Sequence, residues 1–144
     1  MRLLVAFDGS EGARAALREA ASLARETGAS VVLLQVLNPL LDASDIAAPS
    51  TEVAMVTATA RAKAGLEAAL GESGLDAAKA ELVVGVTEHG EDYAEAIERE
   101  ARARGATMIV ISSRRAAGLM GALLGSVTDH VIRNAPCPVL VVRE

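Results

Sequence analysis

The sequence is poor in aromatic residues and in cysteine. Phe7 and Tyr93 are the only phenylalanine and tyrosine among 144 residues, and tryptophan is absent. Few rings are therefore available to stack on the bases of a nucleic acid. The single cysteine, Cys137, excludes a disulfide within the chain and a metal site built from several cysteines of one chain. Because no histidine is near it in the sequence, Cys137 is not expected to act as a nucleophile.

The chain also lacks an excess of positive charge. Its net charge is −5, and only two of its 14 basic residues are lysines. General binding to DNA or RNA depends on clustered basic side chains that meet phosphates, so we expect no nucleic-acid partner. Arg114 and Arg115 form the only adjacent basic pair.

Long apolar runs are missing as well. No segment approaches the roughly 18 apolar residues that span a bilayer, so we expect no membrane partner. The apolar start of the chain ends at Asp8 and is too short for a signal peptide. With 51% apolar and 23% charged residues, the composition is typical of a globular protein. We expect one cytoplasmic domain, residues 1–144.

Apolar segments alternate with helical ones along the chain. The apolar runs predict strands that are buried on both faces, at 2–7, 30–37, 80–86, 107–112 and 138–142. Helices are expected between Ser10 and Gly28, from Thr51 to about Leu70, from Asp92 to Arg104, and from Gly125 to about Asn134. This alternation predicts an α/β fold, a doubly wound five-stranded parallel sheet with helices on both faces.

Several segments carry more specific expectations. Residues 38–50 contain two prolines and two aspartates and are predicted to be a loop, long enough to be a lid or a mobile flap. The helix that follows is expected to align Val53, Val56, Ala60 and Ala64 along one stripe.

Charged residues crowd the helix that ends at Arg104, and its face with Glu95, Glu98 and Glu100 is interpreted as solvated and salt-bridged. His89 and His130 each lack a second ligand at helical spacing, so we expect no transition-metal site.

Ligands of doubly wound sheets bind beyond the carboxyl ends of the strands. Two such ends stand out, the segment from Ala6 to Ser10 and the segment from Ser112 to Ser126. If the first and fourth strands are neighbours, Asp8 and the helix that starts at Gly125 face one crevice. Backbone N–H groups at 126–128 would then attract an anion, although a simple helix cap explains the same residues.

Over its whole length the chain resembles the universal stress protein family. The segments that carry the resemblance are LLVAFDGSEGARAAL near the start, VVLLQV, ATMIVISSR and, most specifically, GSVTDHVIRNAPCPVLVV near the end. The resemblance implies the strand order 3-2-1-4-5 and a homodimer formed through the last strand, Pro138 to Val142. It also implies an ATP site, with Mg²⁺ only alongside the nucleotide.

By the same resemblance, Val36 would line the adenine pocket, with Ala6 and Asp8 at the end of the first strand. The remaining site residues would come from the segment after the fourth strand: Ser112, Arg114, Arg115, Gly125, Ser126, Val127 and Thr128.

The phosphate loop of this chain departs from the family pattern. ATP-binding members carry G-x-x-G, nine residues, then G-[ST]; here Gly125 and Ser126 match, but Ser112 and Arg115 replace the two earlier glycines. Glycine permits unusual dihedrals and a close approach of N–H groups to phosphate, so the loop is expected to be weakened. The Arg115 side chain would fill the phosphate space, or Arg114 or Arg115 would clamp a phosphate through its guanidinium.

Three functions remain open at this point. The first is a regulatory module that binds ATP and acts as a homodimer in stress response. The second is a stress protein without nucleotide that works through protein–protein contacts. The third is an enzyme that slowly hydrolyses ATP or handles adenylates, which the missing P-loop lysine motif disfavours.

If the Arg115 side chain fills the phosphate space, Arg115→Gly should strengthen ATP binding, because it restores a family glycine and removes that side chain. The measurement is the rise in melting temperature that ATP with Mg²⁺ produces in each protein. An unchanged or smaller rise in the variant would contradict occlusion by Arg115.

Overall fold

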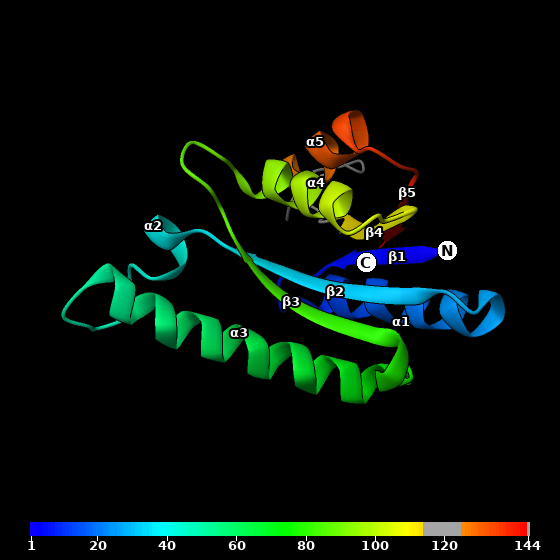
Figure 1. The fold of residues 1–144 in the computed structure, drawn as a ribbon, viewed down its shortest axis with the longest axis horizontal. Helices are drawn as coiled ribbons and strands as arrows, with labels where there is room; N and C mark the ends of the chain where they lie inside the picture. Colours follow the sequence, from blue (N-terminus) through cyan, green and yellow to red (C-terminus); the bar gives the residue numbers. More distant parts are fainter. Residues whose placement is uncertain (114–124, 144) are drawn as a thin grey trace.

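The computed structural model describes residues 1–113 and 125–143 and contains one five-stranded parallel sheet. Its strand order is β3-β2-β1-β4-β5, which confirms the order that the family resemblance implies (Figure 1). The strands match the predicted segments to within one residue at each end: β1 (Arg2–Ala6), β2 (Ser30–Leu37), β3 (Ala80–Val86), β4 (Met108–Ser113) and β5 (Val139–Arg143).

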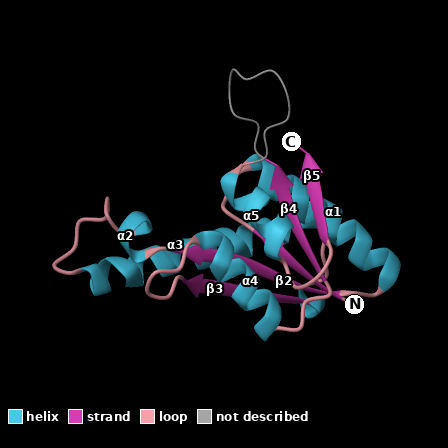
Figure 2. Ribbon diagram, turned by 90° about the horizontal axis from the view of Figure 1, so that it is seen from above, coloured by secondary structure: helices cyan, strands magenta, loops and turns pink. Residues whose placement is uncertain are grey.

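Helices cover both faces of the sheet (Figures 1 and 2). On one face lie α1 (Glu11–Thr27) and α3 (Thr51–Ser73), and on the other lie α4 (Tyr93–Ala103) and α5 (Ser126–Asn134). Two short elements complete the described chain, α2 (Pro39–Asp42) and the 3₁₀ turn η1 (Ala77–Lys79). None of the described helices is both long and apolar enough to cross a membrane.

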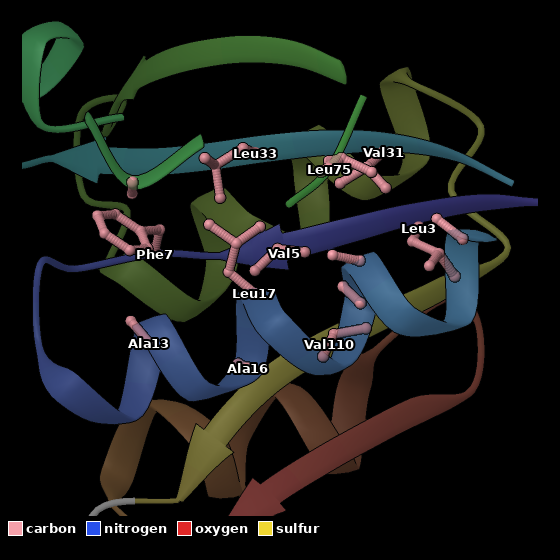
Figure 3. Packing of buried hydrophobic residues seen from close by; sticks show 14 of the residues in the cluster. Leu3, Val5, Phe7, Ala13, Ala16, Leu17, Val31, Leu33, Leu75 and Val110 are labelled. Carbon is pink, nitrogen blue, oxygen red and sulfur yellow. The ribbon is translucent and has the colours of Figure 1, made fainter. Parts of the chain in front are cut away.

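The central strand β1 is buried by both helical layers. Leu3 and Val5 point toward α1, where they pack with Leu17 (Figure 3), whereas Leu4 belongs to the core beneath α4 and α5. Alternate residues of a strand point to opposite faces, so a strand covered on both sides must be apolar throughout. This requirement explains why the apolar runs predicted the strands so closely.

The buried face of α3 differs from the predicted stripe. Val53 and Val56 are 47% and 71% exposed. The side chains that face the sheet and α1 are Ala54, Ala58, Ala62, Leu66 and Ala69. In a helix this rich in alanine, hydrophobic periodicity is weak, and packing against the sheet decides which face is buried.

The segment 38–50, predicted to be a loop, contains the short helix α2, so the prediction was wrong for Pro39–Asp42. The Asn38 side chain accepts a hydrogen bond from the Leu40 N–H at 3.0 Å, and proline stands at the start of the helix. An Asx cap followed by proline is a recognised start of a helix. The cap therefore starts α2 one residue after the end of β2.

Glu98 also differs from its prediction, because it is buried rather than solvated. Its Oε1 lies 2.8 Å from His130 Nδ1, which joins α4 to α5. Glu100 does form an ion pair, with Arg104 at 2.8 Å, although its side chain is only 13% exposed. Hydrogen bonding to Glu98 raises the pKa of His130, and the nearby carboxylates of Asp92 and Glu95 act in the same direction.

We expect the Glu98–His130 pair to make the free energy of unfolding depend on pH. The pKa of His130 is raised above its ordinary value of 6.5, so the folded state favours the charged imidazolium. This stabilisation is fully present below the unfolded-state pKa and is lost as the pH rises through the folded-state pKa. Denaturant unfolding at about pH 6 and about pH 9 measures the change, which Glu98→Gln should diminish.

His89→Gln is the matched control, because it replaces the other histidine and should leave the pH dependence in place. The same pH dependence in the wild type and in Glu98→Gln would contradict the assignment.

Candidate functional site

A cavity of about 460 Å³ opens at the carboxyl ends of β1, β2 and β4. It brings together eight of the residues predicted from the sequence: Ala6, Asp8, Val36, Ser112, Gly125, Ser126, Val127 and Thr128. The end of β1 and the start of α5 therefore face one crevice, as their order along the sheet requires. Arg114 and Arg115 lie outside the described residues. The binding roles of all ten stay predictions.

The end of β1 places Asp8 at the cavity through a tight turn. Gly9 has a φ of +84°, in the left-handed region that favours glycine. Asp8 Oδ1 accepts a hydrogen bond from the Ser10 N–H at 3.0 Å, and Ser10 Oγ accepts one from the Ala13 N–H at 3.1 Å. Ser10 thus caps α1, as the sequence predicted. The same turn orients the Asp8 carboxylate.

Val36 contributes its backbone to the cavity, because β2 continues beyond the end of β1. The last paired residues of the two strands are Ala6 and Leu34, and the Phe7 N–H donates to the Leu34 C=O at 2.8 Å. The next ladder bond, from the Val36 N–H to the Phe7 C=O, is not formed. Backbone polar groups alternate in direction along a strand. The N–H and C=O of Val36 therefore point into the space beyond the last paired residue of β1.

The start of α5 contributes uncapped amide groups. Gly125 is the N-cap and makes no side-chain cap bond; the first intrahelical bond joins the Asp129 N–H to the Gly125 C=O at 2.9 Å. The N–H groups of Ser126, Val127 and Thr128 precede that bond and have no carbonyl partner within the helix. With the helix dipole, they favour an anion at this end of the cavity.

Thr128 holds this helix start in position. Its Oγ1 donates a hydrogen bond to the Ser112 C=O at 2.8 Å, and both residues are buried. The Thr128 hydroxyl is therefore hydrogen-bonded to the end of β4, and the backbone N–H of Thr128 is the group that can donate to a ligand. Ser112 acts in this contact through its backbone.

The cavity lining also includes seven residues that the sequence analysis did not select, among them Phe7 and Gln35. Leu34, Ile97 and Ile111 form apolar walls, and Asp42 and Tyr93 add a hydrogen-bonded pair. The Tyr93 hydroxyl donates to Asp42 Oδ2 at 2.7 Å, although the two residues are 51 positions apart. A rule that included the ends of all strands would have selected the segment after β2, which contains Asp42.

Cys137 and the histidines lie outside this lining. Burial raises the pKa of the Cys137 thiol, so the reactive thiolate is disfavoured. Within 1–113 and 125–143, no three His, Cys, Asp or Glu side chains gather closely enough to hold a metal ion. A cation at this site would have to share its ligands with a bound molecule.

Comparisons with known proteins agree with this architecture. The model of the universal stress protein family matches residues 1–143. A universal stress protein of Thermus aquaticus, from the QAH/OAS sulfhydrylase 3' region, is 31% identical over 141 residues, which cover 98% of this chain and 97% of that protein. Universal stress protein YxiE of Bacillus subtilis is 30% identical, over 99% and 98% of the two chains.

Solved structures are similar over nearly the whole chain. A universal stress family protein of Burkholderia pseudomallei is 28% identical with a TM-score of 0.69, over 98% of this chain and 94% of that one. An Archaeoglobus fulgidus universal stress protein in complex with dAMP has a TM-score of 0.64 at 24% identity, over 99% and 97% of the chains. A universal stress protein solved in complex with cAMP has a TM-score of 0.64 at 21% identity, over 99% of this chain and 96% of that one. The last two likenesses show the fold alone. By the family match and the two relatives above 29% identity, the chain belongs to the universal stress protein family.

Proposed function

We propose that this protein is a regulatory module that binds an adenine nucleotide, ATP with Mg²⁺, in the cavity at the carboxyl ends of β1, β2 and β4. It acts as a cytoplasmic homodimer in the response to stress, by binding rather than by catalysis. The base lies against Val36, and the phosphates lie at the start of α5.

The observation that carries this proposal is the open backbone edge at Val36. Its N–H and C=O offer one donor and one acceptor side by side inside the cavity. The N1 atom and the 6-amino group of adenine are their complements. Leu34, Ile97 and Ile111 provide the apolar walls that a flat base requires.

The opposite end of the cavity suits the phosphates. The N–H groups of Ser126, Val127 and Thr128 attract negative charge. Asp8 lines the same cavity and would hold Mg²⁺ jointly with phosphate oxygens. Ser112 and Arg115 stand where the family pattern has glycine, so this part of the site is weakened. A guanidinium of Arg114 or Arg115 would offset part of the loss.

Relatives add support from their ligands. The two similar structures solved with dAMP and with cAMP hold molecules that combine adenine with a single phosphate group. Such ligands depend less on a complete triphosphate loop. The same binding mode in this chain would preserve adenine recognition even where the loop glycines are replaced.

Two alternatives remain. A nucleotide-free protein that works through protein–protein contacts is favoured by the replacements at Ser112 and Arg115. An enzyme that slowly hydrolyses ATP would need an activated nucleophile; the titratable groups in the described lining are Asp8, Asp42 and Tyr93, a set that favours binding.

We expect ATP with Mg²⁺ to raise the melting temperature of the wild-type chain, because a ligand that binds only the folded state stabilises it. Ser126→Asp should diminish the rise, since a carboxylate at the first turn of α5 competes with phosphate for the same N–H groups. Ser50→Asp is the matched control: it places the same charge at the N-cap of α3, outside the cavity lining. No rise at millimolar ATP in the wild type would favour the nucleotide-free alternative.

The proposed homodimer forms through β5, which is an edge strand of the sheet. The Ile109 N–H donates to the Pro138 C=O at 3.0 Å, so the backbone groups of Leu140 also face β4. Those of Val139 and Val141 face outward. An unpaired outer edge of this kind, with Leu140 37% exposed, is suited to pairing with the same strand of a second copy.

We expect Val141→Pro to shift the chain from dimer to monomer, because it removes an outward N–H and leaves the β4 ladder intact. Val86→Pro is the matched control, since it removes an outward N–H from β3, the opposite edge strand. Light scattering coupled to size-exclusion chromatography measures the mass of each protein. A monomeric wild type, or a dimer that survives Val141→Pro, would contradict this interface.

A further inference from the structure

Asp42 presents a fixed carboxylate inside the cavity. It is the last residue of α2, and its Oδ2 accepts hydrogen bonds from the Asn38 N–H at 2.6 Å and from the Tyr93 hydroxyl at 2.7 Å. Two donors from different segments hold this oxygen in place. No residue in the described ranges donates to Oδ1, which keeps its capacity to accept a hydrogen bond.

The carboxylate lies on the same backbone edge as the open groups of Val36. The Leu34 C=O faces β1, and Val36 follows two residues later with the same direction. Asn38 follows after two more residues in an extended conformation, with φ of −108° and ψ of 117°. Its N–H therefore points to that edge too, and the Asp42 carboxylate is bonded to it. Along the edge, the order is donor, acceptor, acceptor: Val36 N–H, Val36 C=O and Asp42 carboxylate.

The complement of that order is acceptor, donor, donor. Adenine supplies it with N1 and the two hydrogens of its 6-amino group. We infer, on the basis of the proposed function, that Asp42 determines specificity by accepting the second amino hydrogen, the one that Val36 leaves unbound. A base without a free 6-amino group leaves the carboxylate unpaired, at the cost of a lost charge-assisted hydrogen bond.

Tyr93 is the positioning residue for this carboxylate. It begins α4, directly after the Asp92 capping box, so its backbone is anchored independently of α2. Burial and the neighbouring Asp42 raise the pKa of Tyr93 to about 12. The hydroxyl consequently stays protonated at neutral pH and continues to donate to Asp42. As the only tyrosine in a chain without tryptophan, it also reports binding through its fluorescence.

The test compares ATP with N6-methyl-ATP, in which a methyl group replaces one amino hydrogen. We expect the wild type to bind ATP about tenfold more tightly, the loss of one hydrogen bond to a charged group. Asp42→Asn keeps the shape but turns an NH₂ group toward the base, so the two affinities should become nearly equal. Asp45→Asn is the matched control, because Asp45 lies close in sequence but outside this lining. It should keep the wild-type ratio.

Isothermal titration in the presence of Mg²⁺ measures each affinity, and an unchanged melting temperature verifies the fold of each variant. Tyr93→Phe should lower the ratio in the same direction, whereas a merely structural tyrosine would weaken both ligands equally. If Asp42→Asn discriminates as the wild type does, the inference about Asp42 is overturned while ATP binding stands. If the wild type binds neither nucleotide, the proposed function itself fails.

Guanine presents the same acceptor–donor–donor order through O6, N1–H and its 2-amino group. GTP therefore belongs in the titrations. Tighter binding of GTP than of ATP by the wild type would overturn the assignment of the amino group to adenine.

Discussion

The difference in length between two neighbouring strands is the constraint on which the site depends. β1 stops pairing at Ala6, whereas β2 continues to Leu37. Buried backbone N–H and C=O groups need hydrogen-bond partners. Where one strand extends beyond its neighbour, water or a ligand has to supply the partners for its last N–H and C=O groups. At Val36 these groups lie inside a cavity with apolar walls. The fold thereby presents a hydrogen-bonding edge in a place where a flat heterocycle can reach it.

Contacts between distant segments hold the two ends of the cavity at a set separation. Thr128 fastens the start of α5 to the end of β4, and the Glu98–His130 pair fastens the same helix to α4. At the other end, Tyr93 bonds α4 to α2 through Asp42. Helix α4 thus contacts Asp42, at the proposed adenine end of the cavity, and α5, whose start is the proposed phosphate end. A shift of α4 would therefore alter the positions of groups at both ends.

Much of the fold can be predicted from the amino-acid sequence. The continuous apolar runs of β1, β2 and β4 identify buried parallel strands, and Asp92 with Glu95 forms the capping box that its spacing indicates. The buried face of α3 cannot be predicted in this way, because alanines on every side of the helix give no clear hydrophobic stripe. The sequence neighbours of Glu98 include charged residues typical of a solvent-exposed helix face, so they give no sign of its burial. Only the contact between Glu98 and His130 explains why this carboxylate is buried.

The sequence alone determined the alternation of strands and helices, the family, and the candidates Asp8 and Gly125-Ser126 at the strand ends. Local spacing and hydrophobic pattern carry that information, because they act through neighbours in the chain. Only the tertiary structure decided that β1 ends before β2 and that Tyr93 meets Asp42, 51 residues away. Such features arise from register and from packing between elements, and no local pattern of residues encodes them.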